Sequence, residues 1–101
     1  MWLFALFDLP VDGPKERRAY TRFRRILLKH GFQMLQYSVY ARYVLSEDAS
    51  RNYRRRIRAA LPEDGQVRLL SVTDRQFAKM ECFVGAKRKP PEPPPQQRML
   101  F

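Results

Sequence analysis

The sequence predicts an α+β domain in which two helices cover one face of an antiparallel sheet. Three observations support this prediction. Apolar runs of strand length alternate with two segments whose apolar residues recur at helical spacing. Turn-forming and helix-ending residues separate these segments. The length of 101 residues leaves room for one domain, whose core is thin enough that oligomerisation would commonly support it.

The first strand is predicted over residues 2–7, an apolar run that ends at Asp8 and the Leu9-Pro10 break. Because apolar residues do not alternate with polar ones there, we expect burial on both faces of the strand. A helix is predicted to begin at Pro14, since proline suits the first helical position, and to stop before Gly31.

Residues 32–44 are predicted to form one long strand that contains a bulge or bend. Ser46 is placed to cap a second helix, whose core face includes Tyr53 and Ile57. Pro62 lies just beyond this helix and stops it.

The remaining chain adds a strand over residues 67–72, a turn or one helical turn over residues 73–79 that Thr73 can cap, and a short strand over residues 80–84. The predicted order is β-α-β-β-α-β, which is the ferredoxin-like arrangement. We expect residues 1–85 to form the domain. Residues 86–101 contain a proline-rich, semi-rigid linker and an apolar ending.

The sheet face that the helices leave bare also carries apolar side chains, from the first strand and from residues 32–44. Such a face needs a cover, and a second copy of the chain is the simplest one. We therefore expect a homodimer with facing sheets.

The charge is strongly unbalanced, with 20 Lys and Arg against 10 Asp and Glu, a formal net charge of +10. The expected partner is a polyanion, and nucleic acid is the usual one. An anionic membrane is the competing surface, but no basic helix with a bulky apolar face of the interfacial type is present.

Cys82 is the one cysteine, so the chain offers neither an internal disulfide nor a cysteine metal cluster. The apolar start is too short for a signal peptide, and no stretch approaches the length of a membrane span. We expect a cytoplasmic protein.

Asp8 stands alone at the end of a strand expected to be buried, where an unpaired charge is costly. One explanation is a divalent cation such as Mg²⁺, which prefers carboxylate oxygens. The other is a helix cap or a salt bridge to Arg17, Arg18 or Arg22. One carboxylate per chain makes a poor metal site, and two Asp8 side chains meeting across a two-fold axis would make a better one.

No other catalytic pattern is present. His30 is expected at a helix end and Cys82 in the core, and there is no glycine-rich phosphate loop. The two helices instead hold twelve basic residues and three acids. Arginine forks suit phosphate oxygens, and such contacts position nucleic acid without reading its sequence. The aromatic residues are expected in the core, because the basic-Gly-aromatic signature of RNA-recognition sheets is absent.

Several short motifs in a fixed order resemble the CRISPR-associated protein 2 family. They span nearly the whole chain: Phe7-Asp8-Leu9-Pro10, Arg17-Arg18-Ala19-Tyr20 with Phe23, Gly31-Phe32, Gln36-Tyr37-Ser38-Val39-Tyr40, and Met80-Glu81 with Val84-Gly85. Leu9-Pro10 and the ending Gln97 to Phe101 look most like members from type II systems.

This resemblance implies a ferredoxin-like homodimer whose last strand, here residues 80–84, joins the partner's sheet. It implies a place at the centre of the spacer-acquisition complex, between copies of the integrase, CRISPR-associated protein 1. There the dimer would hold a protospacer duplex by its backbone. Some family members are described as Mg²⁺-dependent endonucleases on RNA or duplex DNA.

Asp8 matches the family's metal-binding and catalytic aspartate. Arg22, with Arg17 and Arg18, matches its helix arginines, and Ser38 and Tyr40 match its Ser-Val-aromatic motif. From the charge pattern, the nucleic-acid surface is expected to include further residues: Arg25, Arg54, Arg55 and Arg58. Met34 departs from the family, since nuclease-described relatives often carry Arg there.

Two hypotheses therefore stand, a non-catalytic DNA-binding adaptor and a metal-dependent nuclease. We favour the adaptor, because one carboxylate cannot build a two-metal site within one chain. A basic RNA-binding subunit is a third alternative. At the end of the chain, Met99, Leu100 and Phe101 on a stiff proline tether have the form of a peptide that docks on the integrase. A frayed terminus is the simpler alternative.

Overall fold

The structure is a computed structural model, and it describes residues 1–89. Met99, Leu100 and Phe101, the predicted docking residues, lie outside this part of the chain. The helices and strands of the described part are β1 (Trp2–Asp8), α1 (Pro14–Lys29), β2 (Gln33–Gln36), β3 (Val39–Tyr43), α2 (Glu47–Arg58), β4 (Gln66–Val72), α3 (Asp74–Ala78), β5 (Cys82–Val84) and β6 (Lys87–Lys89).

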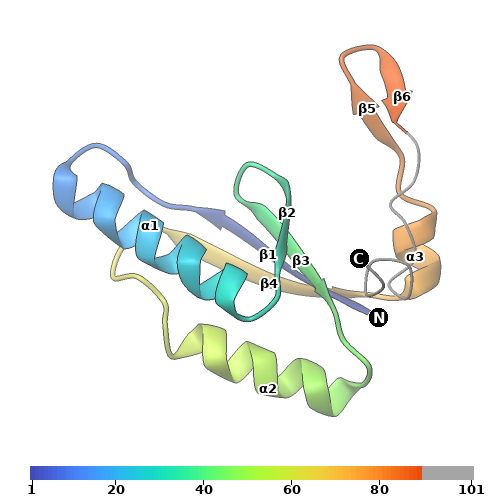
Figure 1. The fold of residues 1–101 in the computed structure, drawn as a ribbon, viewed down its shortest axis with the longest axis horizontal. Helices are drawn as coiled ribbons and strands as arrows, with labels where there is room; N and C mark the ends of the chain where they lie inside the picture. The colour runs from blue at the N-terminus through green and yellow to red at the C-terminus, as the bar shows by residue number, and fades with distance from the viewer. Residues whose placement is uncertain (90–101) are drawn as a thin grey trace.

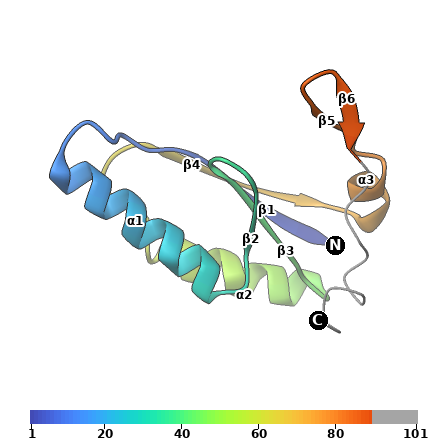
Figure 2. The same ribbon diagram turned by 45° about the horizontal axis from the view of Figure 1, so that its top comes forward.

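Four strands form one antiparallel sheet in the order β2-β3-β1-β4. Helices α1 and α2 lie side by side on one face of this sheet (Figures 1 and 2). The two helices connect β1 to β2 and β3 to β4, which gives the β-α-β-β-α-β order of a ferredoxin-like domain. The predicted fold class is therefore confirmed.

Strand β1 lies at the centre of the sheet and is apolar on both faces, as its sequence predicted. Its odd-numbered residues, Leu3, Ala5 and Phe7, join the core beneath the helices. Its even-numbered residues, Trp2 and Phe4, join a second cluster on the opposite face, where the Phe77 ring stacks on Trp2 with 4.2 Å between ring centroids. The first cluster also contains three buried helix residues: Phe23, Leu27 and Ile57.

The prediction of one long strand over residues 32–44 was wrong, because the segment is a hairpin of β2 and β3. The chain reverses at Tyr37 and Ser38, where Ser38 has a positive φ of 61°. Its carbonyl accepts a hydrogen bond from the Phe7 backbone N–H at 3.0 Å, so the turn is fixed against β1. The hairpin supplies the two consecutive strands that the ferredoxin-like order requires.

The predicted helix ends are confirmed. The Ser46 hydroxyl accepts a hydrogen bond from the Ala49 N–H at 3.1 Å at the start of α2, and Thr73 forms a capping box with Gln76 at the start of α3. Gly31 follows α1 with a φ of +83°, a conformation that glycine adopts without strain.

A second hairpin, formed by β5 and β6, stands apart from the four-stranded sheet. It projects beyond α3 on the side of the sheet opposite the helices (Figure 2). Strand β5 covers three of the residues predicted as the last strand, and β6 consists of residues that we assigned to the linker. Within residues 1–89 the helices are too short or too polar to cross a bilayer.

Arg42 on β3 fastens the end of α1 to the rest of the fold. Its Nη1 donates to the His30 carbonyl at 2.6 Å, and its Nε donates to the Tyr43 carbonyl at 2.9 Å. The guanidinium also lies over the ring of Tyr53 in α2, 4.2 Å from the centroid. One side chain thus joins both helices to the sheet, and its charge complements the negative end of α1.

His30 sits in this junction, and its surroundings predict a pH dependence of stability. Burial of the imidazole is the main cause that lowers the pKa of His30 from its usual 6.5. Nearby positive charges act in the same direction: Arg56, Lys29 and Arg42.

Because the unfolded chain then takes up this proton at a higher pH than the folded chain, stability is full above pH 6.5 and falls as the pH drops below it. Chemical denaturation at about pH 7.5 and about pH 5.5 measures this loss. The variant His30→Gln should lose less stability over the same interval. An equal loss in both proteins would contradict the prediction.

Candidate nucleic-acid interface

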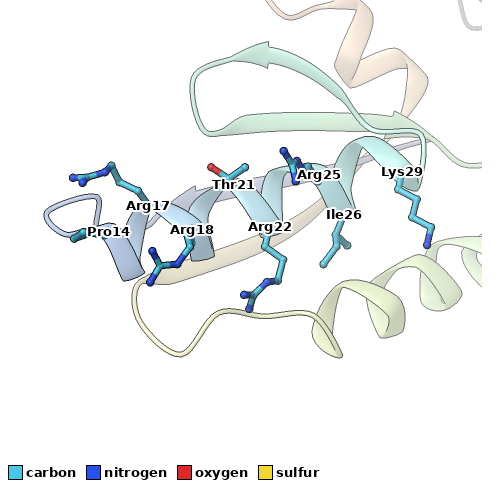
Figure 3. Close-up of a pocket in the computed structure, with 8 residues that line it drawn as sticks. All are labelled: Pro14, Arg17, Arg18, Thr21, Arg22, Arg25, Ile26 and Lys29. Atoms are coloured by element: carbon cyan, nitrogen blue, oxygen red, sulfur yellow. The ribbon is translucent and has the colours of Figure 1, made fainter.

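Helix α1 presents a continuous basic surface to solvent. Arg17, Arg18, Arg22 and Arg25 are all exposed, and they lie on the side of the helix opposite the buried Phe23. They line a shallow groove along the helix (Figure 3) together with four further residues: Pro14, Thr21, Ile26 and Lys29. The helical spacing of the arginines therefore produces one surface rather than scattered charges.

The charges on this surface are not neutralised within the described part of the chain. None of the four arginines takes part in an ion pair there, and Arg17 Nη1 donates to the Val11 carbonyl at 3.4 Å. Glu16 is the one acid among the residues of α1. Free guanidinium groups on a rigid helix can each bind phosphate oxygens with two N–H donors.

The basic surface of α1 borders the connection between α2 and β4, which carries Glu63 and Asp64. Arg18 and Arg22 also border a cleft whose other wall includes Leu61 and Pro62. Lys15 Nζ lies 3.8 Å from an oxygen of Glu63 at the rim of this cleft. A nucleic-acid backbone lying along α1 would therefore meet acidic side chains at this border of the arginine surface.

Helix α2 contributes arginines of two kinds. Arg55 and Arg58 are exposed, and Arg55 donates to the Asn52 side chain at 2.5 Å. Arg54 is half-buried and donates to the hydroxyls of Ser50 and Ser71, so its guanidinium holds α2 to β4. The guanidinium groups of Arg55 and Arg58 are thus accessible to a ligand, whereas that of Arg54 forms hydrogen bonds inside the fold.

Ser38 and Tyr40, the motif pair of the β2–β3 hairpin, occupy different environments. Ser38 is half-buried in the turn beside the end of β1. Tyr40 is only 1% exposed, and its hydroxyl accepts a hydrogen bond from Arg24 Nε at 2.8 Å. A buried ring has no face for a nucleobase, so Tyr40 acts on the helix surface by holding Arg24. Met34, the departure from the family, is 49% exposed on β2.

Asp8 is exposed, so the expectation that its carboxylate is buried was wrong. An exposed carboxylate does not need a partner within the fold. The alternation along β1 places its side chain on the same face as Trp2 and Phe4, away from the helices. Its proposed salt-bridge partners Arg17, Arg18 and Arg22 lie on the helix side of the sheet. Among the described residues Asp8 forms no ion pair.

Arg68 is the residue near Asp8 that sequence reasoning missed. In the β1–β4 register Asp8 lies opposite Gln66 and Leu6 lies opposite Arg68, so Arg68 is a diagonal neighbour of Asp8 on the same face. A signal was available, because Arg68 is the one charge within the predicted strand 67–72.

Asp8 offers only a minimal protein donor set for Mg²⁺ among the described residues. The part of the chain that the structure describes contains no grouping of three His, Cys, Asp or Glu side chains able to hold a metal ion. Mg²⁺ keeps several water ligands and is usually held by one or two carboxylates with substrate phosphates, so the unfavourable feature here is the arginine that neighbours the lone carboxylate. A second carboxylate would have to come from outside this cluster of described residues, for example from a second copy of the chain.

The sheet face opposite the helices carries a broad apolar groove. Its lining combines sheet residues with the segment after α3, including Leu6, Leu35, Val39, Leu70, Phe77 and Phe83. Leu70 is 51% exposed and Phe83 is 55% exposed, although both are large apolar side chains. The helices therefore cover one apolar face of the sheet, and α3 covers only part of the other.

Comparison with known proteins identifies a matching family model and related chains. The family model described as CRISPR associated protein Cas2 matches residues 1–80. A relative from Parvibaculum lavamentivorans, named CRISPR-associated endoribonuclease Cas2, is 48% identical over 101 residues, which span all of both chains. A relative of the same name from Flavobacterium psychrophilum is 41% identical over all of this chain and 88% of its own length.

A crystal structure of Streptococcus pyogenes Cas2 shares the fold. The two structures superpose with a TM-score of 0.65 at 16% identity, over 83% of this chain and all of that one. The resemblance drawn from the short motifs is thus confirmed by the family model and by the full-length relatives. The chain belongs to the CRISPR-associated Cas2 family.

Proposed function

We propose that this protein is an adaptation subunit of a CRISPR system, acting in the cytoplasm as a homodimeric adaptor. It binds duplex protospacer DNA by contacting the phosphate backbone of the DNA. It also bridges copies of the integrase, CRISPR-associated protein 1, during spacer acquisition. The observation that carries the proposal is the exposed arginine surface of α1, whose charges have no acidic partner among the described residues. Membership of the Cas2 family gives this surface its biological setting.

The α1 arginines suit duplex DNA because they are numerous, fixed on one helix and aimed at solvent. Arg17, Arg18, Arg22 and Arg25 span about two turns of α1, so one phosphate backbone can contact several of them. Arg55 and Arg58 extend the contact to α2, while Arg54 supports it from inside. Ser38 lies near the sheet end, and Tyr40 contributes through Arg24.

The second copy of the chain is proposed to cover the apolar groove on the open sheet face. Strand β4 is an edge strand of the sheet, so its outer backbone groups are available for pairing. The β5–β6 hairpin projects from the same side, with Phe83 and Val84 exposed. Both features are accounted for if β5 joins the partner's sheet and the two groove faces meet.

The docking role of Met99, Leu100 and Phe101 remains a proposal from the sequence alone. In it, these apolar residues bind the integrase, and the proline run before them sets the reach of the tether.

A metal-dependent endonuclease is the second candidate, favoured by the word endoribonuclease in the names of the relatives. In that candidate Asp8 is the catalytic, metal-binding residue, and Mg²⁺ would polarise a phosphodiester. Asp8 has no second acid or base of its own chain in a cluster with it, within the region that the structure describes. The adaptor requires no such group, so it accounts better for the geometry.

Duplex binding should be electrostatic and indifferent to sequence. The slope of log affinity against log salt should be about 0.9 for each phosphate contacted, with roughly 4 to 8 contacts in total. Replacing Arg17, Arg18 and Arg22 with Ala should weaken binding to all duplexes alike and reduce this slope by about 2.7.

Fluorescence anisotropy with two unrelated duplexes at several salt concentrations measures both quantities. Arg22→Ala removes one charge from α1, and Arg75→Ala on α3 is its matched control. Both variants lose one exposed positive charge, but Arg75 lies away from α1. A shallow salt slope, or a strong preference for one duplex, would count against the proposed contact.

Dimerisation should depend on the open sheet face. Leu70→Glu introduces a charge into the apolar groove at a side chain that is half exposed in the single chain, so the fold should survive while the dimer dissociates. Leu28→Glu on α1 is the matched control, since Leu28 is 41% exposed on the helix side. Analytical ultracentrifugation at micromolar concentration should show a monomer for Leu70→Glu and a dimer for the control. A monomeric unmodified protein would refute the facing-sheet arrangement.

Asp8 should be dispensable for spacer acquisition. Asp8→Asn keeps the size of the side chain and removes the charge that a metal would need. We expect the variant to retain acquisition of new spacers in cells within about threefold, because binding through arginines does not use this carboxylate. The purified protein and the variant are also incubated with RNA and duplex DNA plus Mg²⁺. Loss of acquisition in a folded Asp8→Asn protein would replace the adaptor with the nuclease.

A further inference from the structure

At the polar end of the open sheet face, one acidic and one basic residue occupy neighbouring positions of the β1–β4 pairing. Down β1 this face displays Trp2, Phe4, Leu6 and then Asp8. The β4 residues opposite them on the same face are, in the same order, Val72, Leu70, Arg68 and Gln66. Three apolar positions on β1 are thus followed by Asp8, with Arg68 on its diagonal.

Diagonal neighbours in an antiparallel pair have Cα atoms about 7–8 Å apart, within reach of a long side chain. Arg68 and Asp8 are both exposed, so neither is held by packing. In the single chain Arg68 Nη2 donates to Gln66 Oε1 at 3.4 Å, a long contact that already brings the guanidinium beside the residue paired with Asp8. A rotation of the arginine side chain is sufficient to bring its charge to the carboxylate.

We propose that Arg68 is the counter-ion of Asp8 and that it makes this carboxylate a weak ligand for Mg²⁺. The inference goes beyond the adaptor function, since it concerns the end of the sheet face and not the arginine surface of α1.

The position of the pair beside the proposed dimer face strengthens this assignment. If a second chain covers the apolar groove, water is partly removed from the neighbouring Asp8, and an unpaired carboxylate there would be costly. Arg68 compensates that charge from within the same chain. Two Asp8 carboxylates meeting across a two-fold axis would likewise each bring their own arginine.

A counter-ion of this kind opposes a metal directly. A monovalent cation about 7 Å from a divalent one raises the free energy of metal binding through charge repulsion that surface screening only partly reduces. Removing the arginine charge should therefore tighten Mg²⁺ binding at Asp8 by about tenfold.

Calorimetric titration of the full chain with MgCl₂ tests this effect. Arg68→Gln keeps a polar side chain that can still contact Gln66 while removing the charge. Arg75→Gln removes the same charge from α3, at the end of the sheet where Phe77 packs on Trp2. We expect tighter Mg²⁺ binding only in Arg68→Gln, and its loss in Asp8→Asn/Arg68→Gln. If Arg68→Gln binds Mg²⁺ no better than the unmodified protein, including the case where neither binds, the proposal is overturned.

A double-mutant cycle provides a readout that involves no metal. In a metal-free buffer, Asp8→Asn and Arg68→Gln should each lower the melting temperature of the protein by about 2–4 °C, and the double variant by clearly less than the sum. Additive losses would show that the two charges do not interact and would refute the pair. Both measurements are separable from the adaptor function, because loss of duplex binding would leave the metal titration and the cycle unchanged.

Discussion

The structure depends on one constraint, which is that β1 is apolar on both faces and lies at the centre of the sheet. Because β1 pairs with both β3 and β4, it cannot move to the rim of the sheet, and other elements must cover both of its faces. Helices α1 and α2 bury the side of Leu3, Ala5 and Phe7. On the other side, Phe77 covers Trp2 and Phe4, while Leu70 remains half exposed. Within residues 1–89 this cover stays incomplete, which is why we propose that a second copy of the chain completes it.

This division of the sheet also separates the two kinds of surface. Because the helices occupy one face, their arginines are kept away from the apolar groove on the other. In the proposed dimer the grooves meet in the middle and the α1 surfaces of both copies face outward. Repulsion between the arginines is then not increased by association, and nucleic acid can supply the missing negative charge. Arg42 supports this arrangement from inside, since it joins both helices to β3 without using an acid.

The fold was largely predictable because its signals are local and strong. The apolar run of β1, Pro14 and Gly31 around α1, and the caps Ser46 and Thr73 each specify an element by themselves. The β2–β3 hairpin was missed because its turn uses Tyr37 and Ser38, with no glycine or asparagine, and depends on the hydrogen bond from Phe7. At the candidate site, the exposure of the α1 arginines followed from helical spacing. The burial of Tyr40, the engagement of Arg54 and the side of the sheet that Asp8 occupies required tertiary packing, which spacing alone does not give.

The position of Asp8 shows how one carboxylate can serve different chemistry within one fold. The pleat of β1 places it on the open sheet face, just beyond the last apolar residue Leu6. A negative charge at the edge of an association surface requires a positive one, and a divalent cation or an arginine can each provide it. Where the neighbouring strand offers an uncharged residue at the diagonal position, a metal has room to bind. Here that position holds Arg68, which we propose as the counter-ion within the same chain. On this argument the diagonal neighbour of the aspartate, as much as the aspartate itself, decides between a metal centre and an ion pair.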